Sequence, residues 1–395
     1  MRVEIGGEAT GPLAGVRVID LSTIVSGPLC GQILGDLGAD VIKIETPGGD
    51  SARYMGGSRA GDISGFFAQL NRNKRSVVLD LKSEAGTRAF RRLAEKTDVV
   101  LENFRPGVLD RLGVGYEVLR KQNPQLVYAA ISGFGPEGPY AGLPAYDMVI
   151  QAVSGIAKMI GSPDQPRLVS NLLADKTAAL NAAFAIASAL FARERTGQGQ
   201  RIEIPMLDAF GGFLHLDQIA ANAFGETQDL PAVGELMFRA WETTDGHLAV
   251  LVIEDHQFAA FCQIVGREDM CSDERFASLV ARMQNAAQLI EFMQGEIGKR
   301  STTEIVGKAQ ALGAPIAAIN DLDGFLADAQ VESSGIVFEI DQPQAGPVPI
   351  LRSAPRFSGT PSDIRRTVPN LGAHTAEVLR EAGLPEAEIE ELADG

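Results

Sequence analysis

The 395-residue sequence predicts an α/β fold built around a parallel sheet. The first observation is that short apolar runs rich in β-branched residues, typical of buried strands, recur through the N-terminal half. The second is that longer segments with apolar residues at helical spacing separate these runs. Such a helix can connect two neighbouring parallel strands, so the alternation indicates consecutive βαβ units.

The first unit comprises a strand over 16–22, a helix over 27–39 with glycines at both ends, and a strand over 40–45. The same pattern continues along the N-terminal half. It predicts strands over 76–81, 98–104 and 126–135, and helices over 83–96 and near 108–122. A Pro- and Gly-rich loop then leads to helices near 147–160 and 173–196 and to a strand running into a helix over 197–210.

The pattern changes after about residue 225. An Asp-Gly turn signal followed by an apolar run predicts a hairpin arm over 243–253. Helical segments fill 256–311, and we interpret roughly 225–330 as a smaller second domain. From 336 the chain returns to strand-like segments and then ends in helices. The composition, 45% apolar and 22% charged, is typical of soluble globular proteins.

Charge and cysteine content exclude several classes of protein. The net charge of −16 argues against a nucleic acid partner, since such binding requires Lys and Arg to neutralise phosphates. The three cysteines show no CxxC spacing, which favours a reduced, cytoplasmic environment. The four histidines show no ligand spacing, so we expect no metal site. We expect neither a secretory leader nor a membrane partner, and the apolar stretch 172–191 is interpreted as a buried helix.

Asp175 lies among small and apolar residues where a helix is predicted to begin. One interpretation is structural, because Asp is a favoured helix N-cap. The other is chemical, because a carboxylate at a helix N-terminus in partly apolar surroundings can attack an acyl carbon as a nucleophile. The two roles are compatible, since capping would also orient the carboxylate.

Two basic segments are candidates for binding an anion. The densest cluster lies in NRNKRS over 71–76, where Lys74 and Arg75 precede a strand. It is either a solvated turn or a phosphate site. In the second segment, Arg105 and Arg111 flank a Pro-Gly turn at the end of a strand, where ligands of open α/β sheets bind.

Long motifs spread along the whole chain resemble those of the family III coenzyme A-transferases, in the same order. They are GPLAGVRVIDLSTIVSGPLCGQILGDLGADVIKIETPGGD, NRNKRSVVLDLKSEAG, VLENFRPGVLDRLGVGYEVLRKQNPQLVYAAISGFG, AYDMVIQAVSG, ADKTAALNAA, RTGQGQRIEIPMLDA and LGAHTAEVLREAGL. The family includes formyl-CoA and carnitine CoA-transferases and also α-methylacyl-CoA racemases. The resemblance implies a Rossmann-like large domain formed by 1–225 and 330–395, with a smaller α+β domain at 226–329 inserted between them. It also implies an interlocked homodimer.

The resemblance also implies a catalytic centre. Asp175 falls on the family's essential aspartate. Tyr146, in AYD, occupies the place where racemases carry a histidine that exchanges the α-proton. Tyrosine is a poor general base at neutral pH, since its reference pKa is about 10, and this favours transfer over racemisation. The CoA contacts that the resemblance implies are Ile24, Val25, Ser26, Asn103, Phe104 and Arg111, to which Lys74 and Arg75 are added on electrostatic grounds.

The implied activity is transfer of CoA from an acyl-CoA to a small carboxylic acid through an aspartyl anhydride and an aspartyl-CoA thioester. No tightly bound cofactor is expected, since CoA and acyl-CoA are substrates. Val25 and Thr46 replace a glutamine and an arginine of the formyl-CoA transferase pattern, which argues against oxalate and formate as the substrate pair. The alternatives are an acyl-CoA racemase or intramolecular CoA isomerase, and a CoA-binding protein without activity.

Overall fold

A computed structural model describes the protein at residues 5–221, 223–224 and 231–394. The chain forms two compact units, one from Met1–Ala220 with Ser334–Gly395 and the other from Ala221–Ser333. Each is described by itself. In the part of the chain that the structure describes, none of the helices combines the length and the apolar character that crossing a membrane requires.

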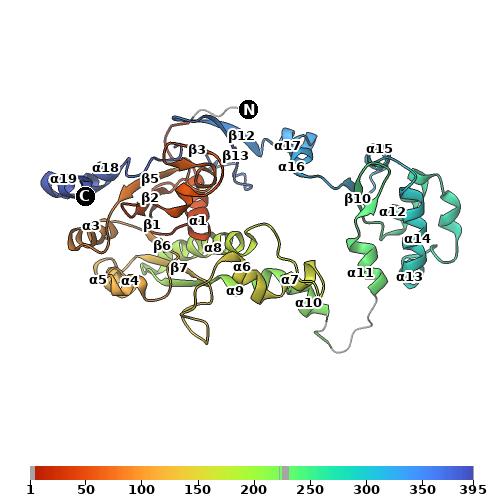
Figure 1. Cartoon of the computed structure of the whole chain (residues 1–395), viewed down its shortest axis with the longest axis horizontal. Coiled ribbons are helices and arrows are strands. Elements are labelled where there is room, and N and C mark those ends of the chain that lie inside the picture. Colours follow the sequence, from red (N-terminus) through yellow and green to blue (C-terminus); the bar gives the residue numbers. More distant parts are fainter. Residues whose placement is uncertain (1–4, 222, 225–230, 395) are drawn as a thin grey trace. The chain divides into compact units, whose positions relative to one another are not determined.

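A six-stranded sheet forms the centre of the first unit, in the order β5-β2-β1-β6-β7-β8 (Figure 1). All neighbouring strands are parallel, which confirms the predicted α/β class. By position along the chain the order reads third, second, first, fourth, fifth and sixth, as in dinucleotide-binding folds. The strands are β1 (Arg17–Asp20), β2 (Asp40–Glu45), β5 (Lys74–Val78), β6 (Val99–Glu102), β7 (Val127–Ser132) and β8 (Arg201–Pro205).

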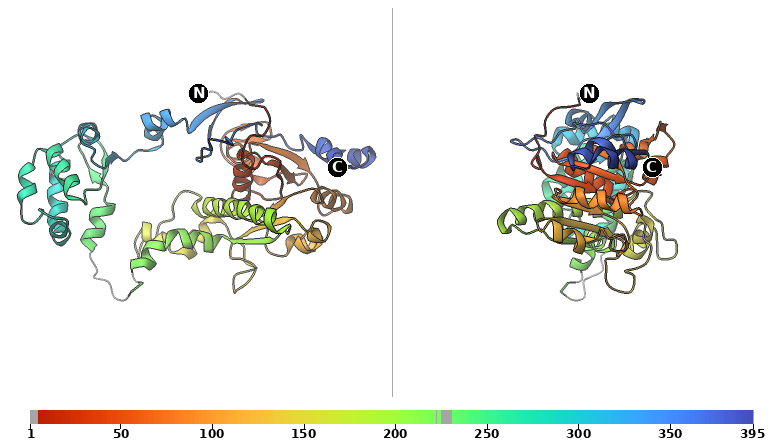
Figure 2. Two further views of the ribbon diagram at one scale, coloured as in Figure 1. Left: turned by 180° about the vertical axis from the view of Figure 1, so that it is seen from behind. Right: turned by 90° about the vertical axis from the view of Figure 1, so that its left-hand side faces the viewer.

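Helices cover both faces of this sheet, so its strands are apolar on both sides. In β1, Val18 packs with α1 (Ser26–Asp36) and α8 (Leu173–Thr196), and its neighbour Ile19 belongs to the cluster on the opposite face. Figure 2 shows α8 running along the sheet beside α1. The opposite face is covered by α3 (Glu84–Ala94), α5 (Tyr116–Gln122), α18 (Thr375–Glu381) and α19 (Glu386–Asp394).

The remaining elements of this unit are short. The helices are α2 (Gly65–Ala68), α4 (Val108–Arg111), α6 (Asp147–Ser154), α7 (Ile156–Ile160), α9 (Met206–Leu214), α10 (Leu216–Ala221) and the 3₁₀ turn η1 (Ser51–Tyr54). Two antiparallel hairpins pair β3 (Arg59–Ala60) with β4 (Ile63–Ser64), and β12 (Val337–Gln342) with β13 (Gly346–Leu351).

Two predicted helices are each divided in the structure. The segment 108–122 forms α4 and α5, with Gly113 between them at φ +71°. The segment 147–160 forms α6 and α7, with Gly155 between them at φ +88°. Both glycines adopt the left-handed conformation that ends a helix. The helices predicted over 27–39, 83–96 and 173–196 are confirmed as α1, α3 and α8.

The second unit combines a small antiparallel sheet with helices. Its strands are β9 (Trp241–Glu242), β10 (His247–Val250) and β11 (Ile316–Ala318), in the order β11-β10-β9. β9 and β10 form the predicted hairpin. Trp241, Phe261 and Leu289 are fully buried in its core. The helical elements are α11 (Pro231–Phe238), α12 (Asp255–Val265), η2 (Glu268–Ser272), α13 (Leu279–Gln284), α14 (Ala286–Ile297), α15 (Thr302–Leu312), α16 (Leu322–Leu326) and α17 (Ala329–Ser334).

Candidate active site

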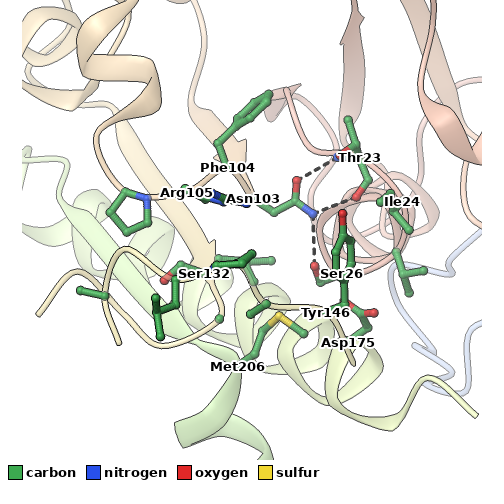
Figure 3. Close-up of a pocket in the computed structure, with 18 residues that line it drawn as sticks. Thr23, Ile24, Ser26, Asn103, Phe104, Arg105, Ser132, Tyr146, Asp175 and Met206 are labelled. Atoms are coloured by element: carbon green, nitrogen blue, oxygen red, sulfur yellow. Dashed lines mark hydrogen bonds between the residues drawn. The ribbon is translucent and has the colours of Figure 1, made fainter. Parts of the chain in front are cut away.

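A cavity of about 250 Å³ lies at the carboxyl ends of β1, β6 and β7 (Figure 3). The strand order reverses between β1 and β6, which is the point where open α/β sheets bind ligands. The residues that line the cavity come from four segments and from three single positions. They are 23–26, 103–106, 131–133, 141, 143–146, Asp175 and Met206.

Asp175 lines this cavity as the third residue of α8. The prediction that it caps the helix is wrong, because α8 begins at Leu173 and Leu172 is the N-cap. A different carboxylate serves the first turn of the helix. The backbone N–H of Asp175 donates to Oδ2 of the buried Asp147 at 3.1 Å, and Oδ1 of Asp147 accepts from Gln151 Nε2 at 2.5 Å. The side chain of Asp175 therefore remains available to the cavity.

The electrostatic surroundings make the Asp175 carboxylate unusually basic. Burial, reinforced by the nearby charge of Asp147, raises the pKa of Asp175 to about 6. Hydrogen bonding to the backbone and side chain of Ser26 opposes this rise. At neutral pH the carboxylate is thus mainly ionised, yet it is more basic than an ordinary aspartate. That combination suits a nucleophile.

Ser26 belongs to a tight turn between β1 and α1, and Asn103, directly after β6, hydrogen-bonds this turn. The Thr23 N–H donates to Asn103 Oδ1 at 2.9 Å, and Asn103 Nδ2 donates to Thr23 O at 2.8 Å and to Ser26 Oγ at 3.2 Å (Figure 3). Ser26 is the first residue of α1, so its N–H has no partner within the helix. Between them, Ile24 has φ +70°.

Tyr146 lies on the same cavity, immediately before α6. Its side chain is 61% exposed and makes no capping hydrogen bond to the helix. No histidine is among the described residues that line the cavity. The cavity therefore combines an aspartate and a tyrosine, and it lacks the imidazole that proton exchange at a carbon commonly uses.

Seven of the ten predicted site residues line this cavity: Ile24, Val25, Ser26, Asn103, Phe104, Tyr146 and Asp175. Arg111 is exposed on α4 and does not line it. The other lining residues are not among the ten, and they include Ser132 and Gly133 where β7 ends and Met206 directly after β8. Their position at strand ends is a signal that could have identified them.

The structure does not bring Lys74 and Arg75 to the cavity. Both are buried, because NRNKRS runs into strand β5 and does not form an exposed loop. Lys74 Nζ lies 2.8 Å from Asp20 Oδ2. Arg75 is paired with Asp40 at 2.6 Å and with Glu381 at 2.7 Å. These ion pairs neutralise the two cations inside the fold, so the interpretation of an exposed phosphate site is wrong.

The comparisons with known proteins agree with one another. The family model described as CoA-transferase family III matches residues 13–375. The succinate–glutarate CoA-transferase of Agrobacterium fabrum is 34% identical over 381 residues, covering 94% of this chain and 95% of that protein. The acetyl-CoA:oxalate CoA-transferase of Acetobacter aceti is 40% identical over 321 residues, covering 79% and 82%. The crystal structure of a CAIB/BAIF family protein from Brucella suis has a TM-score of 0.81 at 34% identity, covering 94% of this chain and all of that one.

Proposed function

Because this chain belongs to CoA-transferase family III, we propose that it transfers coenzyme A from an acyl-CoA to a small carboxylic acid, with Asp175 as the nucleophile. The observation that carries the proposal is the position of Asp175 in the cavity at the strand-order reversal, against the N-terminus of α1. Two similar proteins are named for succinate, glutarate and oxalate, which favours dicarboxylates as the acids.

The proposed reaction begins with attack of the Asp175 carboxylate on the thioester carbonyl of the donor. The carbon–sulfur bond breaks, CoA leaves as a thiolate, and an aspartyl–acyl anhydride remains. The thiolate then attacks the Asp175 carbonyl carbon. This step breaks the anhydride, releases the donor acid as a carboxylate and leaves an aspartyl-CoA thioester.

The second half repeats these steps in reverse order with the acceptor. The acceptor carboxylate attacks the aspartyl-CoA thioester, which expels the thiolate and forms a new anhydride. The thiolate attacks the acyl carbon of that anhydride, giving the new acyl-CoA and regenerating Asp175. No proton is gained or lost overall, so the reaction requires no general base.

Ser26 is the residue that we propose to stabilise the oxyanions formed at the Asp175 carbonyl. Its N–H is free of helical partners, and its backbone and side chain both lower the pKa of the Asp175 carboxyl, as donors facing that group would. The N-terminus of α1 adds the positive end of a helix dipole. One such donor is worth about 10²–10³ in rate. Asn103 would act through Ser26, since it bonds the Ser26 hydroxyl.

We assign the other lining residues to the CoA thioester. Ile24, Val25 and Phe104 would pack against its thiol-bearing arm, and Tyr146 would contact the acyl group. A cavity of about 250 Å³ lies below the usual size of a pocket for a whole drug-sized ligand, which is roughly 300–1,000 Å³. The nucleotide of CoA would therefore lie outside it, where Arg111 stays a predicted contact.

The test is a screen of acyl-CoA donors against succinate, glutarate, oxalate and short fatty acids, with the CoA esters identified by mass. Wild type should form a new acyl-CoA, and D175A should not. D164N, which changes an exposed aspartate in a loop, is the matched control and should be fully active. Full activity of D175A would overturn the proposal. Exchange of the α-proton of a 2-methylacyl-CoA in D₂O without any acid present would favour a racemase instead.

We also propose that the enzyme is a homodimer. Six large apolar side chains on α8, α9 and α10 are each 60% or more exposed: Leu180, Phe184, Phe191, Phe213, Leu216 and Ile219. The alanines of α8 pack in the core, so Leu180, Phe184 and Phe191 lie on the face of α8 that is turned away from it. Exposed apolar surface of this extent is typical of an interface.

Sedimentation analysis tests the dimer directly. Wild type should sediment with the mass of a dimer, and F184D should shift the equilibrium toward monomers. V280D, at an exposed apolar residue on α13 of the second unit, is the control for a charge placed on an exposed apolar side chain outside the proposed interface, and it should remain dimeric. A monomeric wild type would contradict the proposal. The interlocked arrangement remains a prediction from the family resemblance.

A further inference from the structure

The turn between β1 and α1 contains a residue in a conformation that its side chain disfavours. Ile24 has φ +70°, in the left-handed region, where β-branched residues are rare. Such a conformation persists only where the surrounding structure imposes it, and it is typically found at functional sites. Ile24 lines the cavity two residues before Ser26, so its conformation affects the path of the chain into Ser26.

Asp50 supplies that hold. Its carboxylate is 1% exposed, and its two oxygens lie 3.2 and 3.3 Å from the Ile24 backbone nitrogen. Lys43, also fully buried, is paired with Asp50 Oδ2 at 2.9 Å and donates to the Ser22 carbonyl at 2.8 Å. The pair therefore hydrogen-bonds the turn at Ser22 and at Ile24, on either side of Thr23. Asn103, which directly follows the neighbouring strand β6, hydrogen-bonds Thr23.

We infer that Asp50 is a positioning residue for the transfer reaction, which acts by holding Ile24 in its left-handed conformation so that Ser26 faces Asp175. This inference rests on the proposed function of Asp175. Asp50 also has an ordinary structural role, since its side chain caps the 3₁₀ turn η1 by accepting from the Ala52 N–H at 2.9 Å. The experiment must separate these two roles.

D50N is the informative substitution, because asparagine is as good a cap as aspartate but lacks the charge that pairs with Lys43. D36N is the matched control. Asp36 is a buried carboxylate paired with Arg72 at 2.5 Å, and it is the last residue of α1, at the end away from Ser26. Both variants lose a buried ion pair and should lose stability. Only D50N should lose turnover beyond that.

The expected kinetic effects are those of losing one aligned oxyanion donor. When the variants are assayed at temperatures where each is fully folded, kcat of D50N should fall about 10²-fold and its KM should change by less than about threefold. Both kcat and KM of D36N should stay within about threefold of wild type. Glycine adopts a left-handed conformation at no cost, so in the I24G background D50N should lower kcat by less than about tenfold. If D50N alone is insoluble, the ratio of kcat between I24G and I24G/D50N still tests the inference, because it should be less than about tenfold.

The inference is overturned if D50N and D36N lose activity equally, or if D50N has the same effect on kcat with and without I24G. These failures differ from a failure of the proposed function. In that case wild type itself would transfer no CoA, or D175A would stay active, whatever the outcome at position 50.

Discussion

Replacing Asp175, the proposed nucleophile, should make the protein more stable at neutral pH while abolishing its activity. The pKa of Asp175 is raised from 3.8 to about 6, first by burial and then by the charge of Asp147. A group with a raised folded-state pKa contributes stability that is fully present below its unfolded-state pKa and is lost as pH rises through the folded-state value. Above pH 6 the ionised Asp175 therefore weakens the fold, and D175N removes that charge.

The magnitude follows from the two pKa values. For a fully buried group, these two pKa values correspond to a loss of about 3 kcal/mol in the free energy of unfolding above pH 6. Asp175 remains partly exposed, so solvent screening reduces this to about 1–2 kcal/mol. D175N should therefore exceed wild type by about 1–2 kcal/mol in free energy of unfolding at pH 8, and the difference should shrink as the pH falls to 4.

Urea unfolding of both proteins at pH 8, 6 and 4 measures this difference. D36N is the control, and its free energy of unfolding should change in the opposite direction. Asp36 forms a buried ion pair with Arg72, so its replacement should destabilise the protein. The reasoning is refuted if D175N is less stable than wild type at pH 8, or if its advantage does not change with pH. Either result would mean that the cavity does not destabilise the ionised form of Asp175.

Two further predictions concern the surroundings of Asp175. In D147N the loss of a neighbouring negative charge should lower the pKa of Asp175. The acid limb of the kcat–pH profile, expected near pH 6 in wild type, should therefore move to lower pH by less than about one unit. A shift to higher pH would contradict this prediction. In G133A the added Cβ would lie 2.1 Å from Ala145 Cβ, which should displace the segment that carries Tyr146 and lower kcat by at least about tenfold. G212A, where a Cβ meets no atom within 4 Å, should be fully active, and equal effects of the two substitutions would refute the argument.

Local patterns were sufficient to predict the sheet. The β-branched runs around Val18, Ile42 and Val100 identified three neighbouring strands, because strands buried on both faces are apolar at most positions. The start of β5 was missed for the opposite reason. Lys74 and Arg75 are charged, and they are buried only because carboxylates from distant parts of the chain neutralise them. No local pattern contains that information.

The candidate site was predicted in part, and the errors have the same origin. The start of the helix that carries Asp175 was located correctly, but its cap was not, because the carboxylate serving its first turn belongs to Asp147 on α6. The hold on Ile24 by Asp50 likewise joins residues that are 26 positions apart. Ser132 and Met206 were missed although both stand at strand ends, because residue type alone does not distinguish a serine or a methionine of a site from the others in the chain.

Oxygen-18 labelling tests the central claim most directly. In the proposed reaction the donor acid leaves with an oxygen of the Asp175 carboxylate, and an oxygen of the acceptor acid takes its place. After turnover with an acceptor labelled in its carboxylate, mass spectrometry of peptides should find oxygen-18 in Asp175, and in no other aspartate. Complete turnover without label in Asp175 would contradict the account.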